Sequence, residues 1–149
     1  MGSHTFLLYQ IVFATKHRSP CMVKETRQQV FKYMSGIIKR KNCQPFIING
    51  VEDHLHILTH IHQTMPVSKL VAEIKKSSHH FIDKEGLFPR FKNWQDGYGV
   101  FTYSKDAFPN LIKYIENQES HHAKIDFRDE YIGMLEAAGI DYDEKYLFD

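Results

Sequence analysis

The chain has 149 residues, of which 42% are hydrophobic and 25% are charged, and this composition is typical of one folded globular domain. No apolar run approaches the roughly 20 residues that a membrane-spanning helix needs. The first residues also lack the basic and apolar regions of a signal peptide. Cys21 and Cys43 form no metal-type pair and predict no disulfide framework, which favours a reducing, cytoplasmic location.

Positive and negative charges are separated along the chain, although the net charge is only +1. Residues 1–95 hold 14 Lys and Arg against 6 Asp and Glu, whereas residues 96–149 hold 5 against 12. A basic body of this kind can bind phosphates through contacts that weaken with salt. Alternatively, the two parts neutralise each other within a compact fold or a dimer.

The first part of the chain predicts three strands and one helix. Residues 6–14 form a nearly continuous apolar run that is typical of a central strand. Residues 24–41 carry apolar side chains at helical spacing, with basic side chains on the other face. Residues 45–50 predict a second strand and residues 54–58 a third. This third strand could continue through residue 62.

The second part predicts an amphipathic helix over residues 67–82 and a loop over residues 84–99, in which basic and aromatic residues alternate. A short strand follows over residues 100–103. Ser104 is expected to cap a helix that continues to about residue 122. A last helix is expected from about residue 126 to residue 138, where Gly139 ends it.

The predicted order, β-α-β-β-α-β followed by two helices, indicates an α+β protein with a ferredoxin-like (RRM-like) antiparallel sheet. We expect a single domain over residues 1–149, with its core at about 5–104 and a C-terminal extension at about 105–149. In this fold helices cover one face of the sheet, which leaves the other face free for a ligand.

The third strand carries a His-x-His pattern. Because side chains alternate along a strand, His54 and His56 point to one face, about 6–7 Å apart, while Leu55 and Ile57 point to the other. Two imidazoles can hold one divalent ion from one side and leave its other side open, as a catalytic metal site requires. The alternative is two surface histidines, because His-x-His also arises by chance. His60 lies about 13 Å from His56 along a strand and cannot share the ion.

The helix after Ser104 carries Tyr114, Gln118 and His121 as a stripe at i, i+4 and i+7. Gln118 offers a neutral oxygen that could complete a three-ligand metal site with the two histidines, and Tyr114 offers a phenol one turn away. Alternatively, the stripe is a helix edge on which Tyr114 only packs and Gln118 faces water. His121 could support the site by orienting Tyr114 or touching phosphate, or it could be a surface residue.

In combination, these motifs resemble those of the single-tyrosine HUH transposases of small bacterial and archaeal insertion sequences. The HUH motif is present as Asp53-His54-Leu55-His56, and the tyrosine-helix motif spans residues 114–122. Residues 11–18 and 94–101 are also similar to family segments, so the resemblance covers nearly the whole chain in the right order.

The resemblance implies that Tyr114 is the nucleophile and that His54, His56 and Gln118 bind Mg²⁺ or Mn²⁺. A phenol is a weak nucleophile at neutral pH, because its pKa is near 10 and it is protonated. The metal and the positioning of the phosphate would therefore activate its attack on phosphorus. Attack on a DNA phosphodiester would leave a 5′-phosphotyrosine and free a 3′-OH, and rejoining would need no ATP.

The resemblance also implies the partners. The substrates would be single-stranded DNA ends that carry hairpins. The protein would act as a homodimer, in which the tyrosine helix of one subunit can complete the other subunit's metal site. Basic side chains throughout the first part are candidate DNA contacts, namely Lys16, Arg18, Lys39, Arg40, Lys75, Lys76, Arg90 and Lys92.

Of three alternatives, the first stays open, whereas the histidines of the central strand count against the second and the scattered histidine pairs count against the third. A domesticated relative would bind hairpin DNA without transposing it. A nucleic-acid-binding module without chemistry would carry aromatics where the central strand has histidines. A His-rich metal store would bind several ions per subunit through clustered ligands. Tyr98 and Tyr103 are weaker candidates for the nucleophile, because neither has a ligand-type partner at helical spacing.

Overall fold

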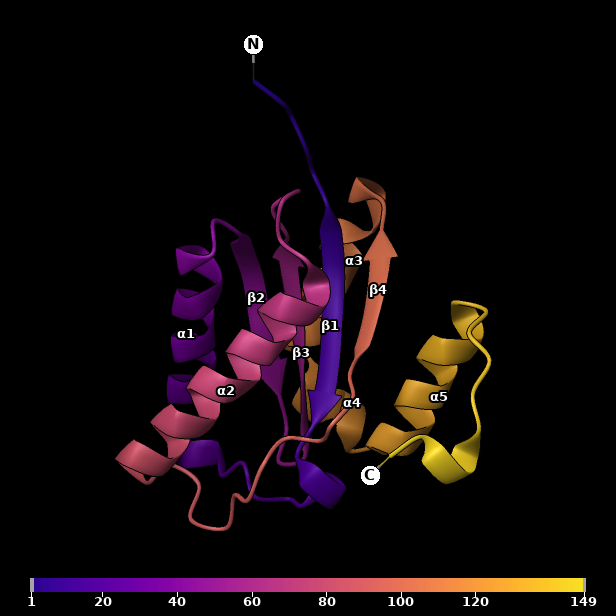
Figure 1. The fold of residues 1–149 in the computed structure, drawn as a ribbon. Helices are drawn as coiled ribbons and strands as arrows, with labels where there is room; N and C mark the ends of the chain where they lie inside the picture. Colours follow the sequence, from indigo (N-terminus) through magenta and orange to yellow (C-terminus); the bar gives the residue numbers. More distant parts are fainter. Residues whose placement is uncertain (1, 149) are drawn as a thin grey trace.

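The computed structural model describes residues 2–148, and a four-stranded antiparallel sheet lies at its centre (Figure 1). In chain order the strands are β1 (Leu8–Ala14), β2 (Gln44–Gly50), β3 (His54–His60) and β4 (Gly99–Tyr103). In space they are ordered β2-β3-β1-β4, and every neighbouring pair is antiparallel. This is the ferredoxin-like arrangement, so the predicted fold is confirmed and the His-x-His strand is an interior one.

Two long helices, α1 (Lys24–Arg40) and α2 (Val67–Glu85), cover one face of the sheet. Leu55 and Ile57 point to this face and are completely buried, as the alternation of β3 predicts. Trp94, from the segment before β4, packs into the same cluster. The large apolar core of the protein therefore lies between the sheet and these two helices.

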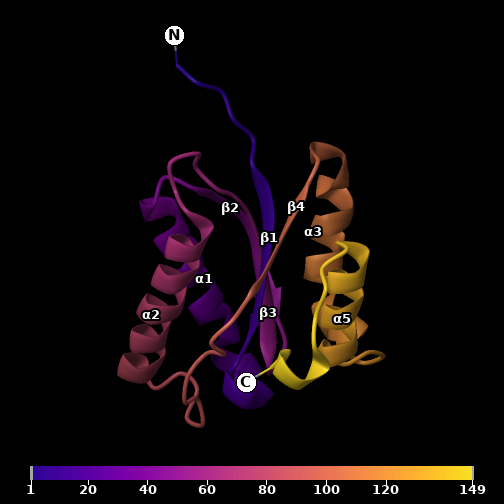
Figure 2. The same ribbon diagram turned by 45° about the vertical axis from the view of Figure 1, so that its right-hand side comes forward.

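The C-terminal helices α3 (Phe108–Glu116), α4 (Gln118–His122) and α5 (Phe127–Ala137) lie on the opposite side of the sheet (Figure 2). The sheet thus lies between two helical layers. The sequence had predicted that the second face is free for a ligand, and this was wrong because the C-terminal helices cover it. Within residues 2–148, no helix has the length and apolar character needed to cross a bilayer. Short 3-10 turns occupy Lys16–Arg18, Lys105–Ala107 and Glu144–Tyr146.

The apolar contacts of this second face form two small clusters rather than one core. One surrounds Leu58 and Ile115, and the other surrounds Phe101 and Phe127. The gap between them is filled by polar side chains from β3 and from the C-terminal helices. The two sides of the sheet therefore differ in kind, with a continuous apolar core on one side and a buried polar centre on the other.

The predicted helix over residues 104–122 is interrupted at Asn117. This residue has φ −96° and ψ 24°, so α3 ends before it and α4 begins after it. The prediction of one continuous helix was therefore wrong. Tyr114 lies on α3, whereas Gln118 and His121 lie on α4.

Candidate metal and nucleophile site

His54 and His56 project from β3 into the buried polar centre, and both side chains are completely buried. A second residue holds each ring from behind, because His54 Nδ1 lies 2.7 Å from Asp53 Oδ1 and His56 Nδ1 lies 3.0 Å from Gln10 Nε2. These contacts leave both Nε2 atoms facing into the site. The Asp53 carboxylate can accept the Nδ1–H of His54, as in a ligand histidine, whereas the Gln10 amide donates to Nδ1 of His56. The ring centroids are 5.4 Å apart, so both imidazoles can serve one ion.

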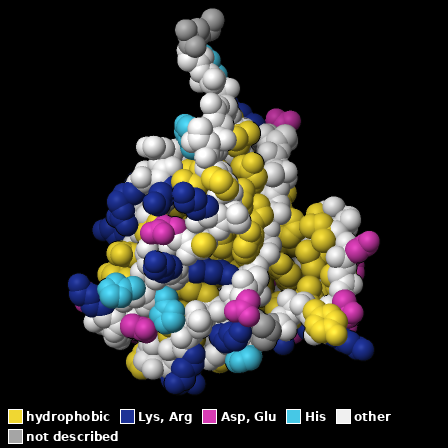
Figure 3. Space-filling view, viewed as in Figure 1, with side chains coloured by type: hydrophobic (Ala, Val, Ile, Leu, Met, Phe, Trp, Pro, Cys, Tyr) yellow, Lys and Arg dark blue, Asp and Glu magenta, His cyan; other side chains and the backbone are white. Residues whose placement is uncertain are grey.

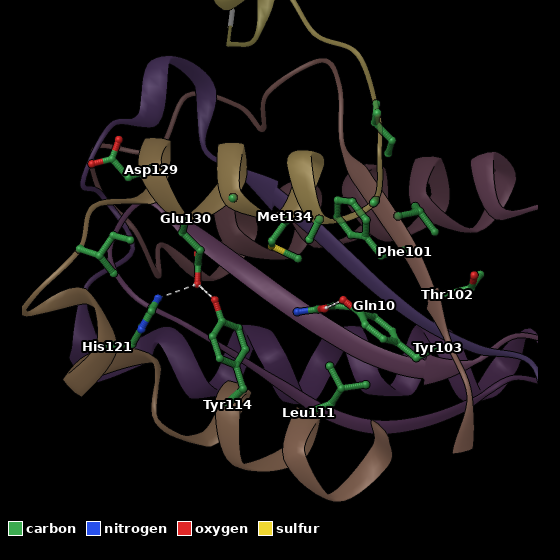
Figure 4. A pocket seen from close by; sticks show the side chains of 16 residues that line it. Gln10, Phe101, Thr102, Tyr103, Leu111, Tyr114, His121, Asp129, Glu130 and Met134 are labelled. Carbon is green, nitrogen blue, oxygen red and sulfur yellow. Dashed lines mark hydrogen bonds and ion pairs between the residues drawn. The ribbon is translucent and has the colours of Figure 1, made fainter. Parts of the chain in front are cut away.

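Tyr114 enters the same site from α3. Its ring lies edge-on to that of His56, with centroids 5.7 Å apart, and its hydroxyl donates a hydrogen bond to Glu130 (Figure 4). Burial and the Glu130 carboxylate raise the pKa of this phenol well above its ordinary value. Tyr114 is therefore a neutral hydrogen-bond donor here and must lose its proton to act as a nucleophile.

The end of α3 is fixed to the sheet by Asn49 of β2. Its Nδ2 donates to the backbone carbonyls of Ile115 at 2.9 Å and Glu116 at 3.2 Å. These are among the last carbonyls of the helix, which have no partner within it. Asn49 is also the register partner of His56 across the sheet. Asn49 thus connects the position of His56 in the sheet to α3, the helix that carries Tyr114.

Gln118 and His121 reach the site from α4. Gln118 is completely buried, and its Nε2 donates to the Tyr114 carbonyl at 3.3 Å, but its Oε1 has no hydrogen-bond partner. A buried carbonyl oxygen without a donor is costly, and a cation would satisfy it. His121 Nε2 lies 3.3 Å from Glu130 Oε2, and its ring centroid is 5.2 Å from that of Tyr114. Despite the break at Asn117, all five predicted site residues lie together, namely His54, His56, Tyr114, Gln118 and His121.

Glu130 of α5 lies at the middle of this group, and the sequence motifs do not predict it. Its Oε1 lies 3.2 Å from His54 Nε2, 3.1 Å from His56 Nε2 and 3.0 Å from His122 Nε2. Burial opposes the charged form of Glu130, but the hydrogen bonds from the imidazoles outweigh it and hold its pKa far below the usual range. His122, on α4, is likewise not predicted as a site residue.

A sequence signal for Glu130 exists in the pattern of α5. The buried residues of this helix are Phe127, Glu130, Tyr131 and Leu135, so the acid occupies a position on the apolar face. A carboxylate on an apolar face is buried at a cost unless it has partners of opposite charge or a metal. This pattern, together with the unexplained histidines of α4, would have indicated the missing residues.

The two histidines of β3 differ in the direction of their pKa. Burial works against protonation of His54, but Asp53 and Glu130 reverse this and raise its pKa overall. Burial dominates at His56 and lowers its pKa despite Glu130. His56 is therefore held neutral, as a metal ligand must be, whereas an ion would have to displace a favoured proton from His54.

An ion-pair cluster fastens α4 to α1. Arg27 is buried, donates to the Met22 carbonyl at 2.9 Å and lies 3.1 Å from a carboxylate oxygen of Glu119. Lys24 lies 3.4 Å from the other oxygen of Glu119. Because Glu119 directly follows Gln118, this contact positions the site residues of α4.

The eight candidate DNA contacts lie outside this centre. Lys and Arg side chains gather over the face formed by α1 and α2 (Figure 3). Several of the eight have structural partners. Lys75 Nζ donates to the backbone carbonyl of Gln95 at 2.7 Å, Arg90 donates to that of Pro20 at 3.0 Å, and the Arg18 guanidinium lies 4.5 Å from the Phe148 ring centroid. The others are Lys16, which lies 3.3 Å from Asp96, and the exposed Lys39, Arg40, Lys76 and Lys92.

A cavity of about 740 Å³ opens beside Tyr114, between β4, α3 and α5 (Figure 4). Tyr114 and Glu130 form part of its wall, together with apolar side chains such as Leu111 and Met134. Tyr103 also lines it and donates to Gln10 Oε1 at 3.0 Å. Tyr114, Glu130 and Tyr103 therefore border the same open cavity.

Comparison with known protein families gives one match over most of the chain. The profile of the family described as "Transposase IS200 like" matches residues 3–118. A Salmonella typhimurium protein named transposase for insertion sequence element IS200 is 31% identical over 115 residues, which are 74% of this chain and 75% of that protein. A Salmonella typhi protein of the same name matches to the same extent.

Two solved structures share the fold. One is a Deinococcus radiodurans protein with a transposase designation, with a TM-score of 0.61 and 22% identity over 79% of this chain and 95% of that chain. The other is a REP-associated tyrosine transposase bound to a REP hairpin, with a TM-score of 0.62 and 13% identity over 84% of this chain and 75% of that chain. At these identities the similarity shows the fold alone.

Proposed function

This chain belongs to the IS200-like transposase family, and we propose that it cuts and rejoins single-stranded DNA with Tyr114 as its nucleophile. The observation that carries the proposal is the meeting of Tyr114 with His54 and His56 in one buried site built from β3 and α3. The two elements are far apart in the sequence, so their meeting is not a consequence of local spacing.

The donors at the site suit a divalent ion. His54 and Gln118 each have a buried polar atom, Nε2 and Oε1 respectively, without a hydrogen-bond partner, and His56 is held neutral. We propose that His54, His56 and Gln118 hold Mg²⁺ or Mn²⁺, with Mn²⁺ bound more tightly because it tolerates imidazole better. A bound ion would neutralise charge on the phosphoryl oxygens and favour attack at phosphorus.

The protein's own residues supply the remaining chemistry. The Tyr114 hydroxyl oxygen forms a bond to phosphorus while the bond from phosphorus to the 3′-oxygen breaks, which gives a 5′-phosphotyrosine and a free 3′-OH. The phenol proton leaves along the hydrogen bond to Glu130 Oε2, and the departing 3′-oxygen takes up a proton, so the step consumes no net proton. Because the ester to Tyr114 keeps the energy of the broken linkage, a 3′-OH of another strand can reverse the step without ATP.

We propose DNA ends that form hairpins as the substrate and a homodimer as the acting assembly. The structural relative that is bound to a REP hairpin supports a hairpin ligand for this fold. The cations over α1 and α2, among them Lys39, Arg40 and Lys76, offer contacts to a phosphate backbone.

The first test is covalent capture. The protein is mixed with labelled single-stranded DNA from the ends of its own genomic locus and with Mn²⁺, and the products are separated on a denaturing gel. We expect a labelled band at protein mass that requires metal and disappears in Tyr114→Phe. Tyr98→Phe, a change at an exposed tyrosine, is the matched control and should keep the band.

Each other outcome has a defined meaning. An adduct that survives Tyr114→Phe would contradict the assigned nucleophile and point to Tyr103 or Tyr98. If the wild-type protein binds hairpin DNA but forms no adduct, the enzyme proposal fails, and the protein is a domesticated hairpin-binding relative.

A mixing experiment tests how the site is shared between subunits. In this structure Tyr114 lies beside the histidines of its own chain. Two inactive variants, Tyr114→Phe and His56→Ala, should therefore stay inactive when mixed and allowed to exchange subunits. Recovery of adduct formation would show instead that the tyrosine of one subunit works at the metal site of its partner.

A further inference from the structure

The strongest unassigned feature is the Glu130 carboxylate, whose two oxygens face different groups. Oε1 faces the imidazoles of β3 and α4, and Oε2 faces Tyr114 and His121. The side chain is only 2% exposed. A carboxylate buried this deeply needs strong partners, and three imidazoles within 3.2 Å of one oxygen are an unusual set of partners.

Hydrogen bonding to Glu130 does not satisfy these imidazoles completely. His56 and His122 make hydrogen bonds to Oε1, but His54 Nε2, although only 3.2 Å from the same oxygen, has no hydrogen-bond partner. A divalent cation would accept a lone pair from all three nitrogens and from the carboxylate at once. The ligand atoms of His54, His56, His122 and Glu130 all lie within 4.8 Å of one another, which is compact enough for one coordination sphere.

The residues behind these donors are arranged as outer supports. Asp53 and Gln10 orient the two histidines of β3, and the ion pair between Arg27 and Glu119 holds α4, which carries His122. The Asp126 side chain caps α5 by accepting from the Asp129 backbone N–H, which fixes the first turn of the helix that carries Glu130. Supports of this kind orient metal ligands and hold their geometry.

We propose that Glu130 and His122 are metal ligands in addition to His54, His56 and Gln118, and that this set selects an imidazole-binding ion such as Mn²⁺, Co²⁺ or Zn²⁺ over Mg²⁺. The inference rests on the proposed function for the presence of an ion and extends it to the ligand set. Three imidazoles and one carboxylate are typical ligands for transition metals, whereas Mg²⁺ prefers oxygen ligands and retained water.

The proposed additional ligands lie beyond the residues that the family profile matches. The family profile ends at Gln118, so His122 and Glu130 both lie in the segment that it does not cover. The Glu130 charge lowers the net positive charge of a bound divalent ion from two to one. Through its other oxygen, the same carboxylate contacts Tyr114, so ion and nucleophile would share one side chain.

The test is metal binding by the metal-free protein, measured without DNA by calorimetry and by the visible spectrum of bound Co²⁺. We expect Mn²⁺ to bind at least about tenfold more tightly than Mg²⁺. Glu130→Gln and His122→Asn should each weaken Mn²⁺ binding by at least about tenfold and change the Co²⁺ spectrum. Glu136→Gln, an exposed acid on the same helix, is the matched control and should bind as the wild type does.

The outcomes separate this inference from the proposed function. Wild-type binding and spectra in both Glu130→Gln and His122→Asn would overturn the ligand assignment, whether or not an adduct forms. Equal affinities for Mg²⁺ and Mn²⁺ would overturn the selectivity. Tight metal binding that depends on Glu130, without any DNA adduct, would support the inference and contradict the transposase chemistry. Circular dichroism of each metal-free variant checks folding. Because His122 and Glu130 lie on different helices, the test can still be decided if one of the two variants misfolds.

Discussion

The two faces of strand β3 show how one strand can serve two purposes. Leu55 and Ile57 enter a continuous apolar core under α1 and α2, while His54 and His56 enter a polar centre under α3, α4 and α5. All four side chains are completely buried. Burial alone therefore does not distinguish a stabilising side from a functional one, whereas the chemistry of the neighbouring groups does.

The difference between the faces is also energetic. Apolar burial on the α1 and α2 side supplies the hydrophobic free energy of folding. On the other side, the buried imidazoles and Glu130 carry desolvation costs that only mutual contacts or an ion can offset. We expect the polar centre to depend on the apolar core for its geometry, and the core to depend little on the polar centre.

The largest expected effect on unfolding free energy follows from truncating an apolar side chain in the core under α1 and α2. Ile57→Ala should lower the free energy of unfolding by about 2–5 kcal/mol, because it removes buried methyl groups and leaves a cavity. Urea denaturation of the metal-free protein measures this loss. Mn²⁺ affinity of the folded variant should stay close to that of the wild type.

His56→Ala is the matched change on the other face of the same strand. It should abolish tight Mn²⁺ binding but cost less unfolding free energy without metal, because a buried imidazole carries its own desolvation cost. If Ile57→Ala weakened Mn²⁺ binding as much as His56→Ala does, the separation of the two faces would be wrong.

A second prediction tests how closely α5 approaches the sheet. A Cβ atom at Gly99 would lie 2.8 Å from Tyr131 Cε1, so Gly99→Ala must displace the buried Tyr131 ring, and we expect α5 to shift with it. We expect a loss of about 1–3 kcal/mol in unfolding free energy, together with weaker Mn²⁺ binding, because Glu130 moves with α5. Both are measured as above.

Gly133→Ala is the control for this change. Gly133 lies on α5 itself, and a Cβ atom there would meet nothing within 4 Å. Alanine in a helix interior should stabilise by about 0.5–1 kcal/mol and leave metal binding unchanged. Equal behaviour of the two variants would show that the approach of α5 does not control the site.

A smaller effect is expected at the junction of β2 and α3. Asn49→Ala removes the donor to the carbonyls of Ile115 and Glu116, at a cost of about 0.5–1.5 kcal/mol. The rate of adduct formation should fall more than DNA affinity, because the helix that carries Tyr114 loses its anchor. Gln28→Ala, which removes only the exposed contact to Asn49 Oδ1, should leave both quantities unchanged.

The smallest effect is expected for the attachment of α4. Glu119→Gln weakens ion pairs to Arg27 and Lys24, and because the carboxylate is half exposed we expect a loss below about 1 kcal/mol that shrinks at high salt. Urea denaturation at low and high salt measures it, with the exposed Glu116→Gln as the control. A loss that does not depend on salt would show that the contact acts through packing rather than charge.

The fold could be predicted from the sequence because apolar residues recur with different periods in its strands and in its helices. The apolar run of β1 and the helical spacing in α1 and α2 depend only on neighbouring residues, and the order of these elements allows few topologies. The shared face of His54 and His56 follows from strand alternation in the same way. The structure confirms each of these features.

The rest of the site depends on contacts between distant parts of the chain. Glu130 meets His56 across 74 positions. The pattern of α5 places this acid on the apolar face of the helix, but only tertiary packing determines that this face meets β3 at the histidines. The break at Asn117 also has no clear local signal, since the residues on both sides favour a helix. The spacing of Tyr114 and Gln118 nevertheless predicted two residues that the structure brings together, because the break changes the helix axis without separating them.

The close approach at Gly99 also gives a criterion for reading related sequences. In a relative that keeps the tyrosine, a larger side chain at this position must displace the tyrosine ring, and we expect the last helix to move away from the sheet and carry an acid equivalent to Glu130 away from the histidines. Glycine at the start of the fourth strand and an acid in the last helix should therefore be inherited together. This pair of positions, outside the two motifs that define the chemistry, would divide such proteins into those with an acidic metal ligand and those without one.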